Sequence, residues 1–173
     1  MIYVKNSEQI EKMKLAGRIT GEAILLAGEA VREGVSTAEL DRIIRHHIEK
    51  CGAKPSFLGY GGFPGSACIS INDEVSHGIP SPKKYLKEGD IVKIDVGAFI
   101  GGYHGDSANT FPVGKVSDEA LRLLEVTKES FRSAVITVQP SASCITPGTP
   151  AFIIGSMAMT IPRKSFTPCP GVP

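Results

Sequence analysis

The sequence lacks an excess of charge of either sign, and it lacks a long hydrophobic run. Its 173 residues carry a formal net charge of +1, which gives no general attraction to the phosphates of a nucleic acid. No segment approaches the roughly 20 consecutive apolar residues that a membrane-spanning helix needs. We therefore expect no nucleic-acid partner and no membrane partner, and small or neutral substrates are favoured.

Paired cysteines and a secretion signal are also absent. No Cys-x-x-Cys pair occurs among the four cysteines, which are Cys51, Cys68, Cys144 and Cys169. This spacing indicates neither a disulfide framework nor a structural zinc site. The polar residues directly after Val4 are unlike a signal peptide. With 42% hydrophobic residues, the chain is expected to form one cytoplasmic domain with a sizeable core.

Two amphipathic helices are predicted at the start of the chain. Asn6 and Gln9 have the spacing of a capping box, and apolar residues then recur at helical intervals until Gly34. Ser36 begins a second capping box, which precedes a shorter apolar series that stops near Gly52. A pair of helices therefore opens the predicted fold.

Two neighbouring histidines lie within the second predicted helix. Adjacent helical positions point in different directions, so His46 and His47 are poorly placed to face one ligand together. We interpret both as surface residues rather than as a metal site.

The middle of the chain is rich in glycine and aromatic residues. Residues 57–65 form a loop of this composition, which can line a pocket, and Ala67–Ile71 is predicted as a strand. Glu74–Ser76 is predicted as a further short strand. The segment His77–Pro80 holds the His77 ring in a set position, because proline restricts the backbone. Taken alone, His77 is either a hydrogen-bonded turn residue or a side chain placed for catalysis.

The strongest local signal is a hairpin between Ile91 and Pro112. A β-branched apolar run is followed by a Gly-Gly turn signal and a second strand-like segment. Asp95 interrupts the first strand and Asp106 lies in the second, where each is costly to bury without a partner. Two interpretations remain open: both aspartates face solvent, or both face a shared cation. In the second interpretation they are half of a metal site.

Five segments of the chain, in their order and spacing, are similar to those of type I methionine aminopeptidases. They are Tyr60-Gly-Gly-Phe63-Pro, Cys68-Ile-Ser-Ile-Asn72, His77-Gly-Ile-Pro80, Gly89-Asp-Ile-Val-Lys-Ile-Asp95-Val-Gly and Gly102-Tyr-His-Gly-Asp106-Ser-Ala-Asn-Thr-Phe-Pro. The resemblance covers residues 1 to about 140 and implies the first half of a pita-bread fold. That half is an α+β architecture, in which an antiparallel sheet carries helices on one face. In the complete fold, two similar halves surround a site for two divalent metal ions.

The resemblance also implies an activity, a substrate and a set of site residues. The family removes the initiator methionine, so the expected partner is the N-terminal Met of nascent polypeptides. Asp95 and Asp106 correspond to metal ligands, and the ions are Co, Mn, Fe or Zn, among which the sequence does not choose. His77 corresponds to a catalytic histidine that contacts the substrate amide and the scissile bond. The residues that correspond to the wall of the methionine pocket are Tyr60, Phe63 and Cys68.

Part of the family's ligand set is missing from this sequence. The complete site needs a histidine and two glutamates from the second half of the fold, yet no histidine follows His104 and no glutamate follows Glu129. Asp95 and Asp106 are therefore two ligands out of an expected five. Residues 141–173 are rich in proline and show no sustained helical or alternating pattern. We expect a half-domain over residues 1–140, in which a third helix from Ser117 to about Val135 lies on one face of the sheet, and an irregular tail over residues 141–173.

Two functional classes fit the sequence, and one origin is inferred for residues 141–173. Either the chain is a methionine aminopeptidase whose tail or partner supplies the missing ligands, or it is a non-catalytic half-domain, inert or serving as a peptide-binding module. Back-translation of residues 156–162 with permitted codons, read in another frame, gives Tyr-Gly-Tyr-Asp-Tyr-Pro, which resembles a segment of the family. We therefore predict a change of reading frame close to Pro140.

Overall fold

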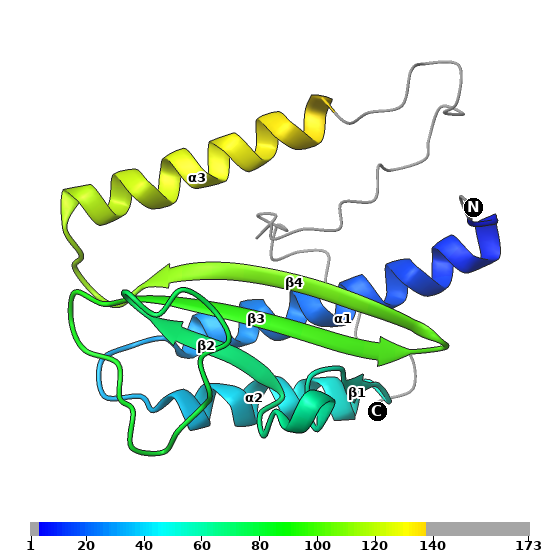
Figure 1. Cartoon of the computed structure of the whole chain (residues 1–173), viewed down its shortest axis with the longest axis horizontal. Helices are drawn as coiled ribbons and strands as arrows, with labels where there is room; N and C mark the ends of the chain where they lie inside the picture. Colours follow the sequence, from blue (N-terminus) through cyan, green and yellow to red (C-terminus); the bar gives the residue numbers. More distant parts are fainter. Residues whose placement is uncertain (1–3, 138–173) are drawn as a thin grey trace.

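The computed structural model describes residues 4–137, which combine an antiparallel sheet with three long helices (Figure 1). In chain order the elements are α1 (Ser7–Ala30), α2 (Thr37–Lys50), β1 (Lys54–Pro55), the 3-10 turn η1 (Tyr60–Gly62), β2 (Ala67–Ile71), β3 (Ile91–Ile100), β4 (Tyr103–Pro112) and α3 (Asp118–Thr137). The predicted tail, residues 141–173, lies outside the described residues. None of the described helices has the length and apolar character needed to cross a membrane.

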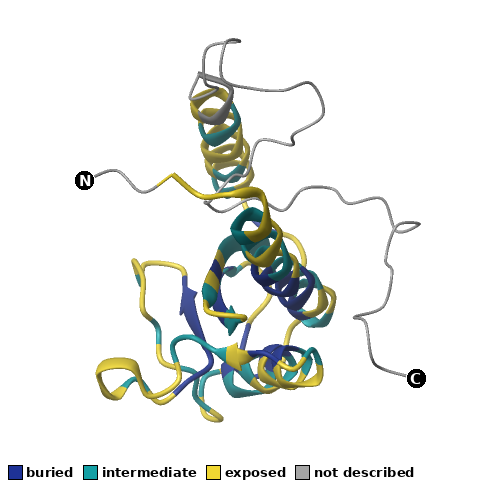
Figure 2. Ribbon diagram, turned by 90° about the vertical axis from the view of Figure 1, so that its right-hand side faces the viewer, coloured by how far each residue is buried: buried dark blue, intermediate teal, exposed yellow. Residues whose placement is uncertain are grey.

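Strand β3 is the centre of the four-stranded sheet. It pairs with β4 along its whole length on one edge, and with β2 and the short β1 on the other. All of these pairings are antiparallel. Helices α1 and α2 pack together on one face of the sheet, where α1 covers β3 and β4 while α2 covers β1 and β2 (Figures 1 and 2). The opposite face of the sheet, here called the outer face, carries the candidate site.

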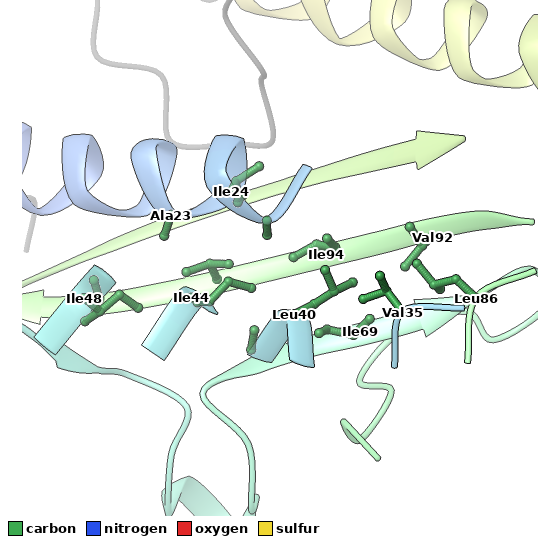
Figure 3. Packing of buried hydrophobic residues seen from close by; sticks show 14 of the residues in the cluster. Ala23, Ile24, Val35, Leu40, Ile44, Ile48, Ile69, Leu86, Val92 and Ile94 are labelled. Atoms are coloured by element: carbon green, nitrogen blue, oxygen red, sulfur yellow. The ribbon is translucent and has the colours of Figure 1, made fainter. Parts of the chain in front are cut away.

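The hydrophobic core lies between the two helices and the inner face of the sheet (Figure 3). Side chains alternate along β3, so that Val92, Ile94, Val96 and Ala98 are fully buried while the residues between them point outward. From α2, Leu40, Ile44 and Ile48 recur every four residues and are also fully buried. Each buried Leu, Ile or Val contributes about 1.5–3 kcal/mol relative to an exposed position.

Helix α1 approaches β4 closely because the contact positions are small or polar. A Cβ atom on Gly105 would lie 2.3 Å from the carbonyl oxygen of Ala16, so the two backbones touch there. Nearby, the Thr20 Oγ1 and Ser107 Oγ atoms are 2.8 Å apart and share a hydrogen bond. This contact sets the position of β4, and therefore of Asp106 on its outer face.

The predicted helix starts and the predicted hairpin are confirmed. Asn6 and Gln9 form a reciprocal capping box, and the Ser36 hydroxyl accepts a hydrogen bond from the backbone N–H of Glu39 at 3.2 Å. Gly101 and Gly102 form the hairpin turn with φ of 61° and 87°, which suits the right-handed twist of paired strands.

Other expectations about the elements are wrong. Helix α1 ends at Ala30 rather than at Gly34, because Val31 turns extended and the Gly34 N–H instead bonds the carbonyl of Leu86 at 2.9 Å. The predicted strand at 74–76 is irregular chain that follows the turn at Asn72 and Asp73, where the Glu74 carboxylate accepts a hydrogen bond from the Ile71 N–H at 2.9 Å.

Helix α3 begins as expected but is placed differently. The Ser117 hydroxyl accepts a hydrogen bond from the Ala120 N–H at 3.1 Å and caps the helix. The sequence predicts a third helix lying on one face of the sheet. Instead, α3 extends away from the sheet and has no extensive packing against any other described element (Figure 1). The helices that cover the sheet are α1 and α2.

Candidate metal-binding site

The hairpin register brings Asp95 and Asp106 to the same face of the sheet. Asp95 lies opposite Ala108, and Asp106 lies opposite Gly97, so the two aspartates are diagonal neighbours on paired strands. Because side chains alternate along a strand and Val96 points into the core, both carboxyl groups point to the outer face. The prediction that both aspartates face a shared point is consistent with this register.

The carboxyl group of Asp106 is close enough to change the protonation of Asp95. Burial raises the pKa of Asp95 to about 6, and the charge of Asp106, together with a hydrogen bond that protonated Asp95 donates to it, adds to the rise. The positive charge of His77 acts in the opposite direction on that pKa. Two like charges that share a small space bind a proton between them unless a cation replaces it.

One carboxyl oxygen of this pair has no partner in the described part of the protein. The Oδ1 atom of Asp95 is buried and forms no hydrogen bond. An unpartnered buried acceptor is costly, and a cation removes that cost. Two adjacent carboxylates with an unsatisfied oxygen therefore fit a divalent ion, which makes Asp95 and Asp106 the residues able to hold one.

Cys68 lies beside the carboxyl pair but is not a thiolate. It is opposite Asp95 in the pairing of β2 with β3, so its side chain is on the outer face, where it is 7% exposed. Burial raises the pKa of its thiol to about 11, and the charges of Asp95, Asp106 and Asp41 reinforce this effect. The neutral thiol is therefore a small apolar surface rather than a soft metal ligand.

His77 is held near the site by a loop pressed against the edge of β2. The Ile69 N–H bonds the Gly78 carbonyl at 2.8 Å, and the Gly78 N–H bonds the Ser70 hydroxyl at 3.0 Å. A Cβ atom on Gly78 would lie 2.2 Å from the carbonyl oxygen of Ile69, so only glycine permits this approach. His77 itself has φ of 57°, an uncommon conformation for a residue with a side chain. The loop thus fixes the backbone of an exposed histidine.

The other two expected pocket residues are less enclosed than Cys68. Tyr60 is 82% exposed at the start of η1, and Phe63 is half-buried directly after it. The glycines between them adopt positive φ, which forms the tight turn that separates the two rings. In the described residues, Tyr60 therefore contributes little buried surface to a pocket.

Phe57, which the sequence placed in the pocket-lining loop but to which it gave no specific role, lies over the outer face. A Cβ atom on Gly97 would lie 2.6 Å from the ring of Phe57, so that ring covers Gly97, which is the residue opposite Asp106. Ser56 anchors the loop to the sheet. Its backbone N–H donates a hydrogen bond to the Gly97 carbonyl at 2.9 Å, and the Ser56 hydroxyl lies 2.8 Å from Nδ1 of His104. The available signal was a glycine two residues after Asp95, where a missing side chain makes room for an aromatic ring.

A second group of ligand-type side chains lies between the helices, away from the outer face. Glu22, His47 and Cys51 place ligand atoms within 4.8 Å of one another, and no other such group of three occurs among residues 4–137. Cys51 is disulfide-bonded, so its sulfur is not available as a thiolate ligand, and the expectation that the cysteines form no disulfide is wrong for this residue. The interpretation of His47 as a surface residue is wrong: its side chain is 16% exposed, and its Nε2 lies 3.2 Å from Oε2 of Glu22. Asp95 and Asp106 have no third ligand of this kind beside them in the described residues.

Comparisons with known proteins identify the family of this chain. The profile of metallopeptidase family M24 matches residues 11–151. The chain is 53% identical over 135 residues to the methionine aminopeptidase of Clostridium acetobutylicum, which covers 78% of this chain and 54% of that protein. It is 47% identical over 140 residues to methionine aminopeptidase 1 of Bacillus subtilis, with 81% and 56% covered.

Solved structures give the same result for the fold. The methionine aminopeptidase of Thermotoga maritima superposes with a TM-score of 0.79 at 37% identity, and covers 81% of this chain and 56% of that one. The expected α+β half of a pita-bread fold is thereby confirmed, and this chain spans about half the length of the relatives it matches. The chain belongs to metallopeptidase family M24.

Proposed function

We propose that this chain forms the first half of a metal-dependent methionine aminopeptidase, which removes the initiator methionine from nascent proteins in the cytoplasm. The observation that carries the proposal is the carboxyl pair of half-buried Asp95 and exposed Asp106, in which Asp95 has an unpartnered oxygen and a pKa raised to about 6. Support also comes from the 53% identity to a methionine aminopeptidase. The proposed partner is the N-terminal methionine of a polypeptide.

The proposed roles follow from what each side chain is able to do. Asp95 and Asp106 hold two divalent ions, Co, Mn, Fe or Zn, which supply Lewis acidity and an activated water when bound. His77, exposed beside this pair, donates a hydrogen bond to the scissile carbonyl and stabilises the negative charge that develops there. The neutral thiol of Cys68 and the rings of Tyr60 and Phe63 form the wall for an unbranched thioether side chain.

A second function is favoured by one observation. The described residues provide two carboxylates but no third ligand within reach of them. Two carboxylates alone bind a pair of divalent ions weakly. In this second proposal the chain is a non-catalytic half-domain that retains the peptide-binding surface, and the enzyme activity needs ligands from elsewhere.

Calorimetric titration of the purified chain with Mn²⁺, Co²⁺ or Zn²⁺ tests the proposal. We expect metal binding, and we expect Asp95→Asn and Asp106→Asn each to abolish it. Asp73→Asn, which changes an exposed aspartate in the turn after β2, should leave the binding unchanged. Tight binding of two ions per chain favours the enzyme, and weak binding of one ion favours the half-domain. Binding that both site variants retain rejects Asp95 and Asp106 as the ligands.

A further inference from the structure

A group of ligand-type side chains joins helices α1 and α2, apart from the outer face that carries Asp95 and Asp106. Glu22 comes from α1, whereas His47 lies in the last turn of α2 and Cys51 directly follows that helix. His47 and Cys51 are four residues apart, so both side chains lie on the side of α2 that faces Glu22. The three ligand atoms all lie within 4.8 Å of one another.

The distances between these atoms are those between neighbouring ligands of a tetrahedral zinc ion. Nε2 of His47 lies 3.2 Å from Oε2 of Glu22 and 3.6 Å from Sγ of Cys51. Zinc bonds of about 2.0–2.1 Å to nitrogen and oxygen and about 2.3 Å to sulfur, at tetrahedral angles, place the same pairs of atoms about 3.3 Å and about 3.6 Å apart. The spacing of α1 and α2 therefore suits a zinc ion that both helices bind.

The surroundings of the group favour a cation. The side chains of Glu22 and His47 are 9% and 16% exposed, so the pair is largely withdrawn from water. A neighbouring positive charge offsets the cost of burying a carboxylate, and the negative end of the α2 dipole lies at the same place. One carboxylate and one thiolate together balance the charge of Zn²⁺.

The oxidation state of Cys51 decides whether the third ligand is available. In this structure Cys51 is disulfide-bonded, so its sulfur does not bind a metal as a thiolate. The proposed function places the chain in the cytoplasm, where thiols are kept reduced and disulfides are rare. A dithiol cleaves the S–S bond by supplying two electrons and two protons, and is itself oxidised to a disulfide. Both cysteines of the cleaved bond are then free thiols.

We propose that Glu22, His47 and Cys51 bind a zinc ion once the disulfide of Cys51 has been reduced, with water in the fourth position. On binding, the Cys51 thiol releases its proton to solvent and its sulfur forms the Zn–S bond. The set of one oxygen, one nitrogen and one sulfur favours Zn²⁺ over Mn²⁺ or Mg²⁺, because thiolate is a soft ligand. The bound ion links α1 to α2 and takes the place of the contact between Glu22 and His47.

Titration of the full chain with Co²⁺ tests the proposal, because a thiolate bound to Co²⁺ gives a charge-transfer absorption band that carboxylates and imidazoles do not give. The chain is first reduced with a dithiol, which is then removed under anaerobic conditions. We expect the band in the reduced wild type, its loss when Zn²⁺ displaces Co²⁺, and no band in the disulfide-bonded chain.

Three variants identify the ligands. Cys51→Ser should remove the band. His47→Gln and Glu22→Gln should each raise the Co²⁺ dissociation constant at least about tenfold, which is the loss that even an outer partner of a metal ligand causes. Circular dichroism shows whether each variant keeps its helices, and should Glu22→Gln fail to fold, Cys51→Ser and His47→Gln decide.

Two further variants are controls. His46→Gln changes the exposed neighbour of His47 on the same helix and should leave the band and the affinity unchanged. Asp95→Asn should also keep the band, so that a failure of the zinc site and a failure of the proposed function are distinguished.

Three results would overturn the proposal. A reduced wild type without the band means that the group does not bind the metal through a thiolate. A band that persists in Cys51→Ser means that another cysteine holds the ion. An equally strong band in the disulfide-bonded chain means that reduction of Cys51 does not open the site.

Discussion

At the scale of single residues, the side chains on the outer face of the sheet are positioned by the register of the strands and by the loop that contacts Gly97. Asp95 and Asp106 were predicted as a pair because a hairpin is local, so its register follows from the position of its turn. The contact of Phe57 with Gly97 was not predicted, because it joins a loop to a strand far along the chain. Periodicity does not reveal such long-range contacts, and the enclosure of a site depends on them.

The raised pKa of Asp95 predicts how stability depends on pH in the metal-free chain. An unfolded aspartate has a pKa near 3.9, whereas folded Asp95 titrates at about 6. Between these values the folded chain binds more protons than the unfolded one, so its stability falls as the pH rises and remains lower above about pH 6. Asp95→Asn should remove this fall and stabilise the chain near neutral pH by about 1–2 kcal/mol, after allowance for partial solvent screening.

Urea unfolding of the metal-free protein at about pH 4.5 and about pH 8 measures this effect. Asp73→Asn, which changes an exposed aspartate, is the control and should follow the wild type. If Asp95→Asn has the same pH dependence as the wild type, the carboxyl pair does not share a proton as inferred.

At the scale of elements, the helices are positioned by backbone contacts that sequence patterns reveal only in part. The helix starts and the Gly101-Gly102 hairpin could be predicted because their signals lie within a few residues. The burial of His47 could not, because its side of α2 is covered only when α1 packs against it. The uncovered position of α3 is also a property of long-range packing, which its amphipathic pattern does not encode.

Two glycines provide a matched test of the contact between α1 and β4. Gly105→Ala forces a Cβ atom to within 2.3 Å of a backbone oxygen of α1, so we expect a loss of at least about 1–3 kcal/mol in the free energy of unfolding. Gly21→Ala, within α1 itself, meets no atom within 4 Å and should stabilise the protein by about 0.5–1 kcal/mol. Urea unfolding compares the stability of the two variants. A Gly105→Ala variant as stable as the wild type would contradict the close approach of α1 to β4.

The burial of His47 makes the joint between α1 and α2 sensitive to acid. Burial lowers the pKa of His47, the charges of Lys50 and His46 act in the same direction, and Glu22 opposes them in part. The unfolded histidine, with a pKa near 6.5, therefore binds a proton before the folded one, and stability is lost as the pH falls below that value. His47→Gln should reduce this loss.

Thermal unfolding at about pH 7.5 and about pH 5.5 measures the difference. His46→Gln is the matched control, since His46 is the exposed neighbour on the same helix. An equal reduction of the acid sensitivity in both variants would show that the effect comes from net charge and not from the buried pair.

At the scale of the whole molecule, a half-site and an uncovered helix occur in a chain that spans about half of its relatives' length. Both features describe a fold whose stabilising contacts and ligand set are incomplete within residues 4–137. The core between the two helices and the sheet is nevertheless well formed, so the half-domain has its own hydrophobic stabilisation. Within the described residues, the hydrophobic core is therefore formed without a complete set of metal ligands.

The last prediction concerns activity. Because the sequence contributes two carboxylates of an expected five ligands, we predict that the purified 173-residue chain releases little or no methionine from Met-initiated peptides with any supplied metal. A gene in which the alternative frame is read after Pro140 should produce an active enzyme, and Asp106→Ala in that product should abolish the activity. His77→Ala in the same product should retain the metal but lose about 2.7–4 kcal/mol of transition-state stabilisation. Metal-dependent methionine release by the 173-residue chain itself would contradict the prediction, because it requires ligands beyond Asp95 and Asp106.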